Sequence, residues 1–331
     1  MHSLYLLAFV GCIVIPPGLL VNRCTKMSHP VPNPEEIGAV LRLLTRAYTG
    51  NYTEYIYEKA VDAMLWNAKN GRVALHEGAM SYVSFGHGPR KLIILPGLSD
   101  GLATVGGKAL LLASPYRAYM DDFTIYMFSR REPLPQGLTI RDMAADQGEA
   151  LRVLGLDQVS VLGVSEGGMV AQWLAIDHPE LVERLVLAVT APGMNGVIRS
   201  CVPGWMDMAR RGDHRALMID TAEKSYSPAY LKKYRRLYPL LGLVGRPKSY
   251  DRFLVNAQAT LSFDARSALQ KILCPTLIIG GTEDQIVGAA ASRELAKGIP
   301  GSELYLYPGL GHAAYEEAKD FNARVFAFLK N

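Results

Sequence analysis

Short apolar runs alternate with helix-like segments over most of this chain, and this alternation restricts its fold more than any other feature. Each run has the length and composition of a buried strand, whereas helical segments between them repeat apolar residues every three or four positions. Strands that alternate with helices form βαβ units. The runs are residues 91–95, 123–129, 158–163, 183–190, 275–281 and 302–307. The sequence therefore predicts an α/β fold with a mostly parallel central sheet flanked by helices.

The alternation is interrupted between residues 193 and 269, where helical patterns and turns occur without a strong strand signal. A segment of this size can form one small subdomain. We therefore predict an inserted all-helical cap at 193–269, between two parts of one core, 27–192 and 270–331. Two alternating runs at 72–78 and 80–88 predict an antiparallel pair of strands ahead of the parallel core.

The first 26 residues form a separate apolar segment, 1–26. Its uncharged run begins at Leu4, ends at Val21 and is long enough for a membrane anchor or a signal peptide. Pro16 and Pro17 would break a helix there. A third reading is a mis-assigned start, because Met27 opens an ordinary cytosolic beginning. We expect a cytoplasmic protein if translation starts near Met27, and otherwise a membrane-anchored or exported one, with membrane contact only through 1–26.

Charge and cysteine content exclude several classes of protein. The net charge of +4 is small for 331 residues and no RNA-binding signature is present, so nucleic acid is not an expected partner. The four cysteines form no CxxC pair, so we expect neither a metal site nor a disulfide framework. In the predicted cap, Lys and Arg outnumber Asp and Glu by about two to one. This excess indicates either a solvated helix face or a surface that steers anionic substrates.

The stretch "GVSEGG" places Ser165 between a predicted strand and a predicted helix. It matches the pattern Gly-x-Ser-x-Gly in the strand–turn–helix context that a nucleophile needs. The turn is strained, and side chains at Gly163 and Gly167 would collide with the backbone around it. The helix start behind the serine directs N–H groups toward developing negative charge. Ser165 is therefore the candidate nucleophile, and the alternative is a tight turn with an incidental serine.

A serine hydroxyl needs a base, and the base needs an orienting carboxylate. Of the seven histidines, His312 follows the last predicted strand, so it lies at the same carboxyl edge of the sheet as Ser165. Asp284 lies just past the preceding strand, and Glu283 beside it is the weaker candidate. The chain order of nucleophile, acid and histidine is that of the α/β-hydrolases.

These residues carry a resemblance to a known family. The segments "PGLSDG", "GVSEGG", "GTEDQIV" and "GLGH" occur in family order, and the chain resembles an α/β-hydrolase fold serine hydrolase with a helical cap from about residue 72 to residue 329. The resemblance implies acyl-enzyme chemistry with Ser165, Asp284 and His312 as catalytic residues. A serine nucleophile, rather than an aspartate, argues against haloalkane dehalogenases and epoxide hydrolases.

One segment departs from the family pattern. Many relatives carry His-Gly where this chain has Pro96-Gly97-Leu98-Ser99. The resemblance implies an oxyanion hole made by the backbone N–H groups of Leu98 and Glu166, with Ser99 as an alternative donor, and backbone donors do not depend on the missing histidine. We assign the Glu166 side chain mainly to a structural role, since a carboxylate is favoured at a helix start.

The expected function is that of a serine hydrolase which cleaves a carboxylic ester or thioester of a small or medium apolar substrate through an acyl-enzyme on Ser165. The expected partner is thus a small-molecule acyl substrate, and no metal or organic cofactor is needed. An acyltransferase or a C–C bond hydrolase could use the same triad. A non-catalytic ligand-binding protein on this fold is the alternative from another class.

Overall fold

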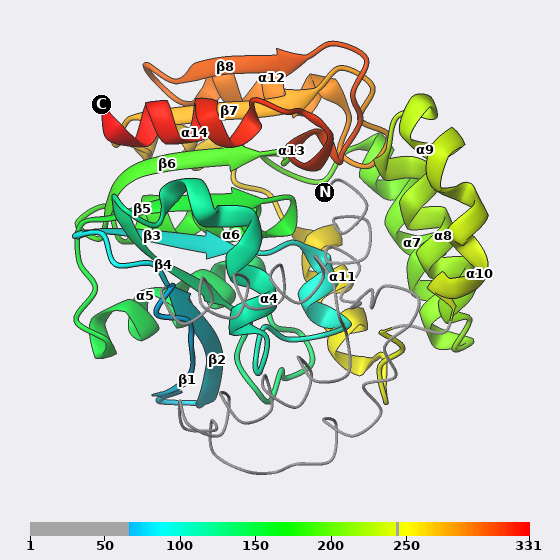
Figure 1. The fold of residues 1–331 in the computed structure, drawn as a ribbon, viewed down its shortest axis with the longest axis horizontal. Helices are drawn as coiled ribbons and strands as arrows, with labels where there is room; N and C mark the ends of the chain where they lie inside the picture. The colour runs from blue at the N-terminus through cyan, green and yellow to red at the C-terminus, as the bar shows by residue number, and fades with distance from the viewer. Residues whose placement is uncertain (1–65, 243–244) are drawn as a thin grey trace, which may run out of the picture.

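The computed structural model describes residues 66–242 and 245–331. Its centre is an eight-stranded sheet in the order β1-β2-β4-β3-β5-β6-β7-β8 (Figure 1). The strands are β1 (Lys69–Leu75), β2 (Gly78–Phe85), β3 (Arg90–Leu95), β4 (Phe123–Phe128), β5 (Val159–Val164), β6 (Val182–Ala188), β7 (Thr276–Gly281) and β8 (Glu303–Tyr307). β2 pairs antiparallel with β1 and with β4. All other neighbouring strands, from β4 through β3 and β5 to β8, pair in parallel. The predicted fold class is confirmed.

Successive residues of the central strands pack on opposite faces of the sheet. In β3, for example, Ile93 and Leu95 belong to one hydrophobic core, and Leu92 and Ile94 belong to the other. Such alternation follows from the two-residue period of a strand, and it makes a strand that is covered on both faces apolar throughout. This is why the central strands appear in the sequence as continuous apolar runs.

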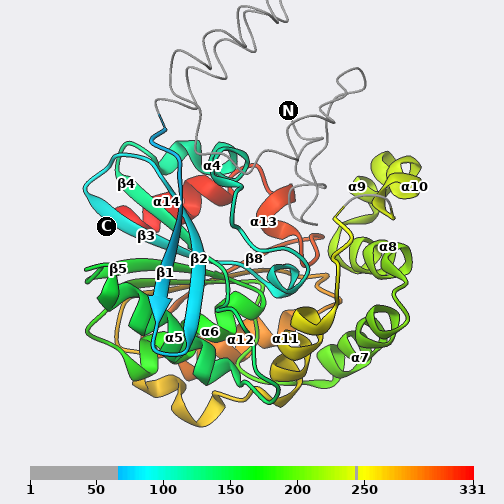
Figure 2. The same cartoon turned by 90° about the horizontal axis from the view of Figure 1, so that it is seen from below.

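Helices cover both faces of the sheet. The helices α5 (Ile140–Val153), α6 (Glu166–Asp177) and α12 (Ala289–Gly298) contribute to the first core. The helices α4 (Ala109–Ala113) and α14 (Phe321–Lys330) contribute to the second core, on the other side (Figure 2). The predicted final helix, from about residue 316 to 329, is divided in the structure. It consists of α13 (Ala314–Glu317) and α14, because Ala318 takes an extended conformation.

The chain between β6 and β7 is helical. It comprises α7 (Gly196–Arg210), α8 (His214–Ser225), α9 (Pro228–Tyr234), η5 (Arg235–Leu237), α10 (Tyr238–Leu241), α11 (Asp251–Ser262) and η6 (Arg266–Lys271). Helices α7 to α10 lie beyond the arrowheads of the parallel strands (Figure 1), over the edge where α/β proteins bind ligands. Its basic run, Lys232, Lys233, Arg235 and Arg236, is exposed, as both a solvated helix face and a steering surface require.

Several predictions lie outside the described residues, including those for the segment 1–26 and the start at Met27. Among residues 66–242 and 245–331, no helix is both long enough and apolar enough to cross a membrane. The compartment of the protein therefore stays a prediction.

Candidate active site

Ser165 occupies a strained turn between β5 and α6. Its backbone has φ 56° and ψ −121°, a left-handed conformation that costs free energy for any residue with a side chain. The flanking glycines permit the turn. A Cβ on Gly163 would lie 2.6 Å from the carbonyl oxygen of Gly167, and a Cβ on Gly167 would lie 2.0 Å from that of Leu95. The steric reason predicted for these glycines is therefore confirmed.

The structure brings Ser165, His312 and Asp284 together from three loops at one edge of the sheet. Ser165 Oγ lies 2.9 Å from His312 Nε2, and His312 Nδ1 lies 2.8 Å from Asp284 Oδ2. His312 and Asp284 are both buried. With the Nδ1 proton directed to Asp284, Nε2 is free to accept the Ser165 proton. Glu283, the weaker candidate, is exposed instead.

Asp284 is held as a carboxylate by its neighbours. Burial alone would raise its pKa, but His312 and two backbone donors outweigh this and keep the pKa below its ordinary value. The donors are the N–H groups of Ile286 and Val287, at 2.8 and 2.9 Å from Asp284 Oδ1. These bonds also fix the carboxylate, so the other oxygen stays directed at His312.

The two predicted oxyanion donors each begin a helix beside Ser165. Leu98 opens the short 3-10 helix η3 (Leu98–Gly101), and Glu166 opens α6. The first N–H groups of a helix have no acceptor within it. Among the described residues, neither donates to a backbone carbonyl of another element. A Cβ on Gly97 would lie only 3.1 Å from Ser165 Cβ, so this loop lies directly against the serine. Their role as oxyanion donors stays a prediction.

A cavity of about 60 Å³ adjoins Ser165 and His312. The helical insertion supplies much of its apolar wall, through Trp205, Leu217, Met218 and Phe253, and the core adds Leu98, Leu102 and Ile286. Trp205 is fixed in place by a hydrogen bond of 2.7 Å from its Nε1 to Asp220. The site is therefore small and mainly apolar, with its reactive groups at one wall.

A larger cavity, about 150 Å³, also adjoins the 96–99 loop. It is bounded by Pro96, Gly97 and Val164, but neither Ser165 nor His312 lines it. The smaller cavity is the candidate site because it alone of these two contains the reactive pair.

The Glu166 side chain has a partner that the sequence did not predict. Its Oε2 lies 3.1 Å from Nη2 of Arg130, and both side chains are only 1% exposed. Burial raises the pKa of Glu166 to about 7, although the nearby Arg130 opposes this rise. The structural role assigned to Glu166 thus depends on an ion pair as well as on the helix start. The only sequence signal was a pair of arginines directly after a buried strand.

No group of three or more His, Cys, Asp or Glu side chains among the described residues is placed to hold a metal ion. Cys201 and Cys274 are unpaired in the structure, whereas Cys12 and Cys24 lie outside the described residues.

Residues 92–319, more than half of the chain, match the family described as alpha/beta hydrolase fold. The chain therefore belongs to the α/β-hydrolase fold family, as its motifs predicted. A crystal structure of the enol-lactonase from Burkholderia xenovorans LB400 has the same fold. It matches with a TM-score of 0.67 and 22% identity, over 79% of this chain and 100% of that one.

Two similar proteins are hydrolases by name. The chain is 27% identical over 259 residues to "Putative carbamate hydrolase RutD" of Caulobacter sp. (strain K31), covering 70% of this chain and 89% of that protein. It is 29% identical over 267 residues to "2-hydroxy-6-oxononadienedioate/2-hydroxy-6-oxononatrienedioate hydrolase 2" of Pseudomonas putida, covering 76% and 92%. These relatives support a hydrolase, and they differ in the bond that their names imply.

Proposed function

We propose that this protein is a serine hydrolase that cleaves a carboxylic ester or thioester through an acyl-enzyme on Ser165. The observation that carries the proposal is the continuous hydrogen-bonded chain from Ser165 Oγ through His312 to Asp284. An incidental serine would not need a positive φ, two obligatory glycines and a buried histidine at 2.9 Å.

The geometry supports a two-step mechanism. Ser165 Oγ attacks the substrate carbonyl carbon while His312 Nε2 takes the hydroxyl proton, and the N–H groups of Leu98 and Glu166 stabilise the oxyanion. The bond to the leaving group then breaks, and protonated His312 gives the proton to the departing alcohol or thiol. Water attacks the acyl-enzyme by the reverse path, which releases the acid and restores the Ser165 hydroxyl.

The size of the cavity supports a small or medium apolar substrate. Its wall of Trp205, Leu217, Met218 and Phe253 offers apolar contact but few groups for a charged substrate. The basic run of the insertion does not line this cavity, so we assign it no contact with the bound substrate.

A C–C bond hydrolase is the second candidate, because one relative carries the name of a hydroxy-oxo-dienedioate hydrolase. Both reactions begin at a carbonyl carbon and use the same triad. Analysis of the products separates them, since an ester yields an acid and an alcohol whereas a C–C substrate yields an acid and a shortened carbon skeleton. An added alcohol or thiol acceptor that takes up the acyl group would indicate an acyltransferase instead.

The proposal is tested by replacing the nucleophile. Ser165→Ala removes the attacking oxygen, so kcat for short acyl esters should fall by roughly 10³-fold or more, with the circular dichroism spectrum unchanged. Asp284→Asn is the matched variant, because it keeps the shape of the carboxyl but weakens the orientation of His312, and it should also lose several orders of magnitude. Ester turnover near the wild-type rate in Ser165→Ala would contradict the proposal.

A further inference from the structure

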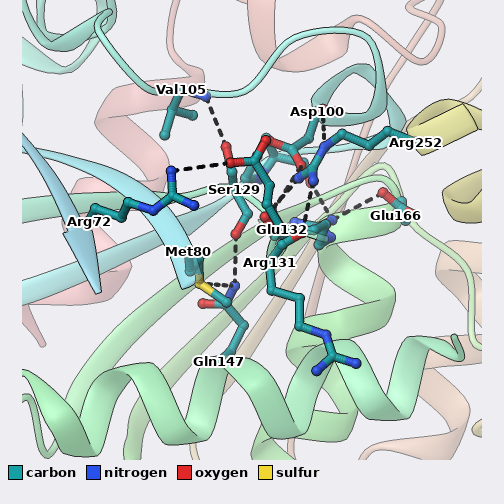
Figure 3. A network of polar contacts seen from close by, with 12 residues as sticks. Arg72, Met80, Asp100, Val105, Ser129, Arg131, Glu132, Gln147, Glu166 and Arg252 are labelled. Atoms are coloured by element: carbon teal, nitrogen blue, oxygen red, sulfur yellow. Dashed lines mark hydrogen bonds and ion pairs between the residues drawn. The ribbon is translucent and has the colours of Figure 1, made fainter. Parts of the chain in front are cut away.

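Arg252 of α11 extends from the helical insertion into the loop that holds the proposed oxyanion donor. Its Nη2 donates to Asp100 Oδ2 at 2.6 Å and to the Arg130 carbonyl at 2.7 Å. Its Nη1 donates to the Arg131 carbonyl at 2.9 Å, and its Nε donates to the Asp100 carbonyl at 3.2 Å. The side chain is only 17% exposed. Figure 3 shows it directed toward Asp100. One guanidinium thus joins the insertion to two loops of the core.

Asp100, the acidic partner, belongs to the turn that begins with Leu98. Its side chain is 0% exposed. Its backbone N–H donates to the carbonyl of Gly97 at 3.1 Å, and its Oδ2 accepts from the backbone N–H of Arg130 at 2.9 Å. The position of the Leu98 N–H is therefore fixed by a turn whose only charged side chain is bound by Arg252.

Arg130 continues the network to the other proposed donor. Its Nη2 donates to the carbonyl of Pro96 at 2.8 Å and to Glu166 Oε2 at 3.1 Å. Pro96 lies two residues before Leu98, where the oxyanion turn, residues 98–101, begins. Glu166 is itself the second proposed donor. The chain Arg252–Asp100–Arg130–Glu166 therefore connects the insertion with both N–H groups.

The contact between α11 and this turn is close as well as charged. A Cβ on Gly101 would lie 2.6 Å from Phe253 Cα, so the two backbones touch. Phe253, the neighbour of Arg252, lines the cavity at Ser165. The planar fork of an arginine can serve several acceptors in fixed directions, which a lysine cannot do.

From these contacts we infer that Arg252 is a positioning residue, which holds the Leu98 turn and the Glu166 N–H at the spacing needed to bind the oxyanion. The inference rests on the proposed function. Arg252 does not touch the reacting atoms, so it acts through Asp100 and Arg130. A displacement of about 1 Å in such a site can reduce the rate on the order of 100-fold.

The test compares Arg252→Lys and Arg252→Met with the wild-type enzyme on the same ester. We expect kcat to fall roughly 10-fold in the lysine variant and roughly 100-fold in the methionine variant, with KM changed little, because the loss occurs in the transition state. Affinity for an alkyl boronic acid, which forms a tetrahedral adduct on the serine, should fall in parallel. The acid limb of the pH profile of kcat/KM should not move, since the triad is intact.

Arg266→Met is the matched control. Arg266 also makes several bonds at the edge of the insertion, to Asp264, Glu294 and the Met194 carbonyl, but none to the 96–101 turn. It should lower the melting temperature without changing kcat or boronic acid affinity. If Arg252→Met does not fold, Arg252→Lys and Asp100→Asn carry the same test.

Variants of Arg252 that lower the melting temperature or raise KM while kcat and boronic acid affinity stay at the wild-type level would overturn the inference, and leave the proposed function standing. Ester turnover that survives in the Ser165→Ala variant would overturn both this inference and the proposed function.

Discussion

Two of the junctions between the helical insertion and the core hold different parts of the candidate site. At the first junction, Arg252 of α11 binds the oxyanion turn through Asp100. At the second junction, the last residue of α8 and the residue that follows it bind the segment that begins at His312. Ser225 accepts a bond of 2.8 Å from the N–H of Ala313. Tyr226 donates to Glu316 at 2.7 Å.

The junctions differ in whether their chemistry depends on pH. A guanidinium stays charged at any pH that a protein tolerates, so the first junction does not lose its cation. At the second junction, burial raises the pKa of Glu316 to about 8, although hydrogen bonds from tyrosines oppose the rise. The comparison indicates that Arg252 binds the oxyanion turn with a cation that does not titrate, whereas the anchoring of the His312 loop through Glu316 changes near neutral pH. Glu166, further along the network of Arg252, also has a raised pKa, of about 7.

Of the substitutions that separate the two junctions, Gly101→Ala at the first junction should have the largest effect on stability and turnover. The new Cβ would meet the backbone of Phe253 at 2.6 Å, and a side-chain rotation cannot relieve such a contact. We expect a loss of about 2–3 kcal/mol in the free energy of unfolding, together with a lower kcat. Denaturant titration and ester kinetics measure the two effects.

Gly204→Ala is the control within the same insertion. Gly204 lies in α7, and a Cβ there would meet no atom within 4 Å. This variant should be more stable by about 0.5–1 kcal/mol with kcat unchanged. Equal behaviour of the two variants would refute the close contact between α11 and the oxyanion turn.

A smaller effect should come from Glu316→Gln at the second junction. The pKa of the Glu316 carboxyl is raised from its ordinary value of 4.5 to about 8 in the folded protein. Between these two pH values, the folded state therefore holds a proton that the unfolded state has released. This stabilisation is complete below about pH 4.5 and is lost as the pH rises toward 8. Between about pH 6 and pH 8, the wild-type protein should lose about 2 kcal/mol through this group.

In Glu316→Gln the slope of stability against pH should be shallower over that range. Part of the slope should remain, because the pKa of Glu166 is also raised, to about 7. Tyr226→Phe removes the hydrogen bond to Glu316 but keeps the titrating carboxyl, so it should lower stability and preserve the slope. An unchanged slope in Glu316→Gln would mean that this carboxyl is ionised in the folded protein at neutral pH.

The sequence predicted the residues that chemistry confines to short motifs. Ser165 could be found because its turn needs glycines at fixed positions, and Asp284 and His312 because parallel strands end at one edge of the sheet. The apolar strands could be found because both faces of the sheet are covered.

The network of Arg252, Asp100 and Arg130 could not be predicted in this way. Arg252 and Asp100 are 152 positions apart, and no spacing rule relates them. In the sequence, Arg252 is one of many basic residues of the insertion and nothing separates it from the exposed ones, although its side chain is largely buried in the structure. The Glu166 side chain shows the same limit, because its ion pair depends on how the segment after β4, which carries Arg130, meets the start of α6.

The most direct test of the account is to identify the residue that reacts with a fluorophosphonate probe, which loses fluoride as it bonds to an activated serine oxygen. Peptide mass spectrometry should find the phosphonyl group on Ser165 alone, with labelling lost in Ser165→Ala and strongly slowed in Asp284→Asn. Labelling at another residue, or equal labelling of wild type and Ser165→Ala, would contradict the claim that Ser165 is the nucleophile.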